Sequence, residues 1–170
     1  SGFEPIDAYV ADDGWNNYSG NFWGFKDVFS DGMSRPSALA DKLGANFGMW
    51  FSPRGGYDYY SSFATNIQNA GNGAKNPNGS DIDVNHPVYL EKVGDMMADF
   101  QDSYNVEYWK LDGFAQRACT DASHGHMVGG TENMYYMVET WENWISIFER
   151  LRENREKQGK GLFLNLTSYT

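Results

Sequence analysis

The chain has 170 residues, 41% of them hydrophobic and 16% aromatic, so it can form an ordered core and is not a disordered segment. Its formal net charge of -10 excludes the basic surface that nucleic-acid binding needs, and it suits a neutral ligand better than a phosphate. No apolar stretch approaches the roughly 18 residues that span a bilayer, so we expect no membrane span. The acidic charge fits an extracellular or cell-surface protein, with a cytoplasmic one left open.

The first predicted strand covers residues 6–11 and is followed directly by Asp12-Asp13-Gly14-Trp15. A loop rich in glycine, asparagine and aromatic residues comes next. Ser34 is a suitable N-cap for a helix over residues 37–42, and Gly44 is expected to end that helix.

The second predicted strand covers residues 47–52 and ends at Pro53. We expect a long loop over residues 54–84, and loops of that length inside a compact domain are usually functional or disordered. Asn85 can cap the following helix, with Pro87 just inside it.

The third predicted strand covers residues 106–112, and a further long loop follows over residues 115–132. Hydrophobic residues then recur at helical spacing, and Gly159 is expected to end this helix. They are Trp141, Trp144, Ile145, Phe148 and Leu151. The fourth predicted strand covers residues 162–166.

Strands that alternate with helices predict an α/β fold with a parallel sheet. The long polar loops all follow strands, where a (β/α)8 TIM barrel builds its active site, and no glycine-rich phosphate-binding turn favours a doubly wound sheet. A whole barrel needs about 250 residues and eight such units. We therefore expect residues 1–170 to be part of a single barrel catalytic domain, covering about its first half.

Polar residues gather where the predicted strands end, and in a barrel these points converge on one mouth. The candidates for this mouth are Asp12, Asp13, Arg54, Lys110, Asp112 and Asn165. Alternation along a strand sends Lys110 and Asp112 to the same face. A lysine beside a carboxylate favours its ionised form, as a glycosidase nucleophile requires, although a structural ion pair has the same spacing.

Asp12 and Asp13 can both reach one ligand only if the backbone turns after them, which Gly14 permits. Carboxylates accept hydrogen bonds from sugar hydroxyls, and the Trp15 ring beside them can cover the apolar face of a sugar. The alternative is a loop-capping aspartate pair with a packed tryptophan.

We predict no cofactor and no metal ligand. The single cysteine, Cys119, excludes a disulfide within the chain and a metal cluster made of cysteines. His124 and His126, with Glu132 or Asp121 nearby, leave a zinc site open, but we favour a loop at the edge of a substrate pocket.

Four short motifs resemble, in order, those of the clan D glycosidases, above all the bacterial α-galactosidases of glycoside hydrolase family 36. An aspartate pair is followed by Gly-Trp at residues 12–15, and Gly-x-Trp-Phe-x-Pro stands at residues 48–53. An Asp-x-x-His/Asn-Pro stretch is matched by residues 83–87, and Lys-x-Asp by residues 110–112.

This resemblance implies a retaining α-glycosidase that acts on an oligosaccharide or glycan. Asp112 would be the catalytic nucleophile, oriented by Lys110, while Asp12 and Asp13 would hold hydroxyls of the sugar. Trp50 or Trp15 would form a wall of the pocket. The general acid/base of the family lies on a later strand, which we expect beyond Thr170 in the remainder of the barrel.

The chain departs from the family pattern at Ser52 and Arg54, where acidic residues are usual, and the family's Cys-Ser-Gly-Gly-Gly run is not seen. These positions shape the sugar pocket, so galactose, N-acetylgalactosamine and other α-glycosides all stay open. Two other functions also remain: a non-catalytic carbohydrate-binding barrel module, and a metal-dependent barrel hydrolase that uses His124 and His126.

Overall fold

The structure is a computed structural model that describes residues 6–114 and 117–167. Its strands are β1 (Ala8–Ala11), β2 (Asn46–Phe51), β3 (Val106–Asp112) and β4 (Phe163–Thr167). Its α-helices are α1 (Ser34–Lys42), α2 (Tyr60–Asn69), α3 (Pro87–Tyr104) and α4 (Met134–Lys157). Three short 3-10 turns lie at Asp27–Phe29, Ala122–His124 and Thr131–Asn133.

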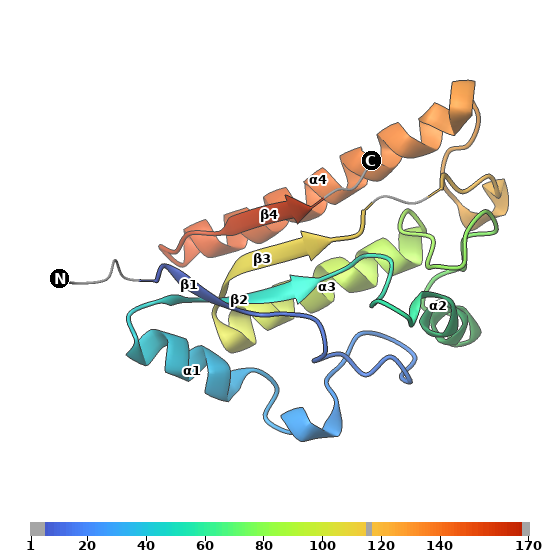
Figure 1. Cartoon of the computed structure of the whole chain (residues 1–170). Coiled ribbons are helices and arrows are strands. Elements are labelled where there is room, and N and C mark those ends of the chain that lie inside the picture. The colour runs from blue at the N-terminus through green and yellow to red at the C-terminus, as the bar shows by residue number, and fades with distance from the viewer. Residues whose placement is uncertain (1–5, 115–116, 168–170) are drawn as a thin grey trace.

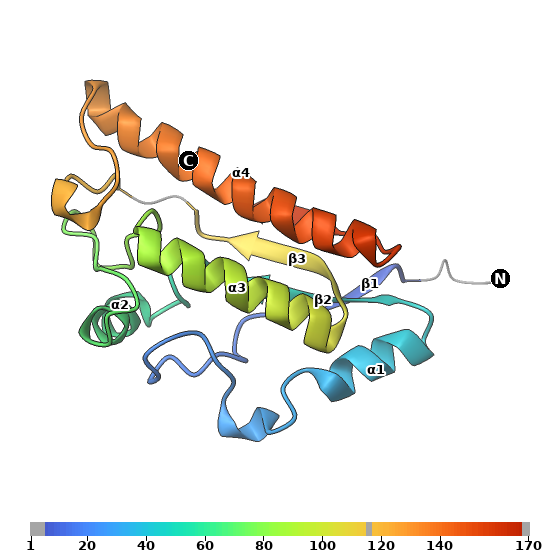
Figure 2. The same ribbon diagram turned by 180° about the vertical axis from the view of Figure 1, so that it is seen from behind.

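The four strands form one parallel sheet in the order β1-β2-β3-β4. Helices α1, α3 and α4 lie on one face of this sheet, as the two opposite views show (Figures 1 and 2). Helix α2 and the long loops lie beyond the carboxyl ends of the strands (Figure 1). One end of the sheet therefore carries most of the irregular chain, as in folds that build their sites from such loops.

The core lies between the sheet and the helices on that face. Met49 and Trp109 are neighbours in the sheet, both fully buried, and the indole nitrogen of Trp109 donates to Gln101 of α3. Alternation therefore directs the neighbouring pair Trp50 and Lys110 to the opposite face, which no described helix covers.

The predicted α/β class and parallel sheet are confirmed, and all four strands lie within two residues of their expected positions. The described residues form an open four-stranded sheet rather than a complete barrel. None of the described helices is long and apolar enough to span a membrane.

The two predicted N-caps are wrong. Ser34 is the first residue of α1 rather than its N-cap, which is Met33, and His86 rather than Asn85 is the N-cap of α3. Asn85 instead donates its side-chain amide to Glu139. Ile145 is 50% exposed, because it lies off the buried face of α4.

Helix α2 lies inside the segment that we expected to be loop. It buries only Phe63, Ala64 and Ile67. Polar and small residues fill its other positions, so the hydrophobic pattern is too sparse to predict a helix over this segment.

Candidate active site

The candidate site is at the carboxyl end of β3, on the face of the sheet opposite α1, α3 and α4. Lys110 and Asp112 share this face by strand alternation, and the register places Trp50 beside Lys110 on one side and Asn165 on the other. Asp112 is 6% exposed, so its carboxylate is largely shielded from water.

The ammonium group of Lys110 pairs with Asp12, which follows β1. Its Nζ lies 2.7 Å from Oδ2 of Asp12. This hydrogen bond is the main reason why the pKa of the Asp12 carboxyl is lowered and the pKa of Lys110 is raised. The negative charge of the Asp112 carboxylate also raises the pKa of Lys110. The Lys110 ammonium group therefore interacts electrostatically with both Asp12 and Asp112.

Two side chains donate hydrogen bonds to Oδ2 of Asp112. The indole nitrogen of Trp50 lies 3.4 Å from this oxygen, and the hydroxyl of Tyr57 donates to the same atom. Among the described residues, none donates to the other oxygen, Oδ1. Asp112 is thus held through one oxygen, which leaves the second available for chemistry.

Asp13 is held by the loop that follows it. The hydroxyl of Tyr18 donates to Oδ1 of Asp13 at 2.7 Å, and the backbone N–H of Asp13 donates to Oδ1 of Asp12 at 2.9 Å. Gly14 follows with a φ of 117°, which supplies the predicted turn. Both aspartates remain exposed, as groups that bind a ligand from solvent must be.

Tyr60 lies among the charged groups of this region. Burial raises the pKa of its hydroxyl, the Arg54 guanidinium lowers it, and the carboxylates of Asp112, Asp81 and Asp13 raise it further. The charges of Asp13 and Asp112 thus both act on the Tyr60 hydroxyl, although the two residues lie at the ends of different strands.

Three residues predicted for the site have other partners. Trp15 is 2% exposed and packs against Phe100 of α3, so its ring offers no free face to a sugar. The guanidinium of Arg54 bonds Asp81 and lies over the ring of Tyr60. Asn165 donates to the hydroxyl of Tyr108, a residue nearer the amino end of β3 than Asp112 is.

Trp50 is in the site, but it is 1% exposed and contacts Asp112 through its indole nitrogen. Its geometry fits a residue that holds the carboxylate better than one that forms an open wall.

Tyr57 and Tyr18 were not predicted from the sequence. The tyrosine-rich segment Tyr57–Tyr60 was the available signal, but it does not indicate which hydroxyl reaches which carboxylate.

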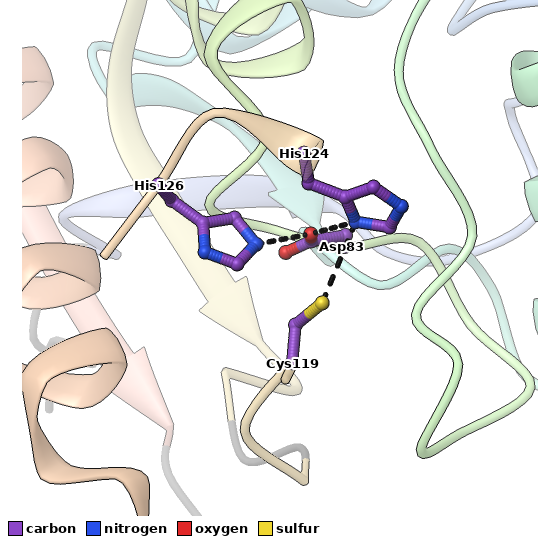
Figure 3. A group of neighbouring side chains, drawn as sticks. All are labelled: Asp83, Cys119, His124 and His126. Atoms are coloured by element: carbon purple, nitrogen blue, oxygen red, sulfur yellow. Dashed lines mark hydrogen bonds and ion pairs between the residues drawn. The ribbon is translucent and has the colours of Figure 1, made fainter. Parts of the chain in front are cut away.

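A second group of polar side chains lies in the loops after β2 and β3, and it consists of Asp83, Cys119, His124 and His126 (Figure 3). Burial raises the pKa of the Cys119 thiol to about 12. Burial also acts to raise the pKa of Asp83, but hydrogen bonds from His124, Tyr136 and the backbone, together with the nearby His126, outweigh it and lower that pKa.

The fold resembles two solved structures. The α-galactosidase from Lactobacillus brevis matches with a TM-score of 0.54 and 19% sequence identity, over 88% of this chain and 22% of that chain. The GH36 α-galactosidase AgaA from Geobacillus stearothermophilus matches with a TM-score of 0.55 and 15% identity, over 94% of this chain and 23% of that chain. No family model matches the sequence, and no curated protein matches it either.

The chain therefore spans less than a quarter of the length of either structure. Likeness at these identities concerns the fold, and it confirms the resemblance that the ordered motifs predicted. Both of these structures, to which this chain is similar in fold, are α-galactosidases, and the Geobacillus enzyme is one of glycoside hydrolase family 36.

Proposed function

We propose that this chain contributes the nucleophile half of a retaining α-glycosidase active site, with an α-galactoside or a related α-glycoside as substrate. The observation that carries the proposal is the arrangement at the end of β3. A nearly buried Asp112 is held through Oδ2 by Trp50 and Tyr57, beside the Lys110–Asp12 ion pair. This arrangement provides a fixed, activated carboxylate of the kind that nucleophilic catalysis needs.

In the proposed first step, Oδ1 of Asp112 attacks the anomeric carbon and forms a bond to it. The glycosidic C–O bond breaks, and its electron pair goes to the leaving oxygen. A second carboxylic acid, outside these 170 residues, donates a proton to that oxygen. Water then releases the sugar from Asp112 in a second displacement, with the second carboxylate acting as base.

Asp12, Asp13 and Lys110 would bind the sugar. Asp12 and Asp13 are exposed, and Lys110 pairs with Asp12 from the strand that carries Asp112, which supports this role because charge-assisted hydrogen bonds are the strong ones in such a site. The bond from Tyr18 orients Asp13, and the bond from Lys110 orients Asp12.

The open sheet supports a further part of the proposal, that these residues form the first half of a (β/α)8 barrel. No helix of the described residues lies over one face of the sheet, and Phe163 on that face is 62% exposed. In a barrel this face would point inward and be covered by the remaining strands.

Replacement of Asp112 by asparagine in the complete protein tests the proposal. Asp112→Asn keeps the shape of the side chain but removes its charge, so hydrolysis of an aryl α-galactoside or N-acetylgalactosaminide should fall by about 10³-fold or more while sugar binding persists. Asp41→Asn, a change at an exposed position on α1, is the control. Turnover close to wild type in Asp112→Asn would rule out the nucleophile, and a wild-type protein that binds sugar without cleaving it would indicate a binding module.

A further inference from the structure

Four side chains of three metal-binding types converge from the loop between α2 and α3 and from the loop after β3. Asp83 lies just before α3, and Cys119, His124 and His126 lie in the loop between β3 and α4 (Figure 3). Their ligand atoms all lie within 4.8 Å of one another. The side chain of Asp83 is fully buried, that of His126 is 1% exposed and that of His124 is 14% exposed.

The shortest contacts within this cluster centre on one oxygen. Nδ1 of His124 lies 2.7 Å and Nε2 of His126 lies 2.8 Å from Oδ2 of Asp83. Sγ of Cys119 lies 3.4 Å from the same nitrogen of His124. Four protein ligands around a tetrahedral zinc ion stand about 3.5 Å apart, so small side-chain shifts would admit the ion.

The outer nitrogen of each histidine also has an acceptor. Nδ1 of His126 lies 3.1 Å from the carbonyl oxygen of Met127, and Nε2 of His124 lies 3.5 Å from Oδ2 of Asp121. With a metal ion bound, an acceptor at the outer nitrogen would hold the proton there, and the lone pair of the inner nitrogen, which now faces Asp83, would be free to bind the ion. Zinc-binding histidines characteristically have such partners.

The Asp83 carboxylate is oriented in the same way. Its other oxygen, Oδ1, accepts from the Tyr136 hydroxyl at 2.8 Å and from the backbone N–H of Asn85 at 3.2 Å. Oδ2 is thereby directed toward the two histidines. Nδ1 of His124, Nε2 of His126 and Oδ2 of Asp83 are thus held close together.

The charges of the donor set balance. One carboxylate and one thiolate compensate the two charges of Zn²⁺, and two neutral imidazoles complete four ligands. Such a centre is neutral overall, which suits a buried position better than an uncompensated ion. Thiolate and imidazole together favour zinc over magnesium or calcium, which prefer oxygen ligands.

We propose that Asp83, Cys119, His124 and His126 bind one structural zinc ion. Four protein ligands fill a tetrahedral shell and leave no position for water or substrate, so the ion would be structural rather than catalytic. The proposal departs from our sequence-based expectation of no metal. That reasoning considered Glu132 and Asp121 as partners of the histidines, whereas the structure brings Asp83 and Cys119 to them.

The ion would join the two long loops at the carboxyl end of the sheet. Asp83 belongs to the loop between α2 and α3, and the other three ligands belong to the loop after Asp112. Hydrogen bonds already link these loops, from the Asn76 side chain to the carbonyl oxygen of Arg117 and from the Asn78 side chain to that of Ala118. Zinc would fix the relative position of these two loops.

Metal analysis and cobalt spectroscopy of the complete protein test this site. We expect one zinc per chain after loading and dialysis. With Co²⁺ in place of Zn²⁺ we expect the visible d–d bands of a tetrahedral centre and a thiolate-to-cobalt charge-transfer band in the near ultraviolet. Loss of even an outer-shell partner weakens metal binding by about 10–100-fold, so Cys119→Ser should weaken zinc binding by at least about tenfold and remove the charge-transfer band.

His86→Asn is the matched control, because the His86 ring lies 5.7 Å from the His124 ring but is not one of the four ligands. This variant should retain both zinc and the cobalt bands. Equal loss of zinc in His86→Asn and Cys119→Ser would overturn the assignment of ligands, as would a charge-transfer band that survives in Cys119→Ser.

If a variant does not fold, zinc analysis and cobalt spectra of the wild-type protein still test whether the site binds a metal ion. Absence of zinc after loading, together with absence of tetrahedral cobalt bands, would overturn the proposal and leave a hydrogen-bonded Asp–His network. None of these measurements requires glycoside hydrolysis, so the zinc site and the proposed function can fail separately.

Discussion

Nζ of Lys110 lies 2.7 Å from Oδ2 of Asp12, so a residue of β3 is joined to the end of β1 across the strand between them. The two residues are 98 positions apart in the sequence. Their pairing brings the aspartate pair after β1 to the same side of the sheet as Asp112. The candidate site thus depends on sheet order as much as on any local motif.

Removal of either partner of this pair should reduce activity of the complete protein. A hydrogen bond to a charged group contributes about 1.5–3 kcal/mol, so Lys110→Met and Asp12→Asn should each lower kcat/KM by roughly 10–100-fold. Because the two residues act together, the double variant should be about as active as the weaker single variant. Strictly additive losses would mean that the pair does not act as a unit.

The pair also predicts how stability depends on pH. The lowered pKa of Asp12 means that its contribution is present above its unfolded pKa of about 3.9 and is lost as pH falls through the lower folded value. The raised pKa of Lys110 means that its contribution is present below about pH 10.4 and is lost as pH rises through the higher folded value.

The free energy of unfolding of wild type should therefore exceed that of Asp12→Asn by a constant amount between about pH 4 and pH 10, and the difference should shrink outside this range. The side chains are 33% and 61% exposed, so we expect a difference of at most about 1 kcal/mol that decreases with added salt. Denaturant titrations across this pH range measure it. A difference that grows below pH 4 would contradict the assigned ion pair.

Tyr57→Phe removes a hydroxyl that donates to Asp112 but keeps the ring. Tyr57 is 50% exposed, so stability should change by less than about 0.5 kcal/mol, whereas kcat should fall roughly tenfold because Asp112 is held less firmly. Tyr59→Phe is the control, since Tyr59 is equally exposed at 51% and its ring stacks on Tyr18. Equal effects of the two changes on kcat would contradict a specific role for the Tyr57 hydroxyl.

Local sequence patterns were sufficient to predict the strands and the two long helices on the covered face of the sheet. Strong hydrophobic periodicity marks α3 and α4, and Gly44 and Gly159, with φ values of 70° and 69°, end α1 and α4 as expected. The pattern fails at α2, which buries three residues only. The pattern also fails at the start of α3, where the Asn85 side chain bonds the distant Glu139 and does not cap the helix.

The candidate site was predictable only in part for the same reason. Alternation along one strand places Lys110 and Asp112 on a common face, but it cannot show that the ammonium group bonds Asp12 or that Tyr57 bonds Asp112. Asp83 and Cys119 are 36 positions apart and belong to different loops, so no short motif joins them to the histidines. Trp15 is adjacent to the aspartate pair in sequence, yet its ring turns into the core.

Chemical trapping of the complete protein tests the role of Asp112 most directly. A fluorinated α-glycosyl fluoride that forms the covalent intermediate quickly and releases it slowly should add the mass of one sugar per chain. Peptide mapping by mass spectrometry should then locate that sugar on Asp112. A label on any other carboxylate, or hydrolysis with inversion at the anomeric carbon, would contradict the account.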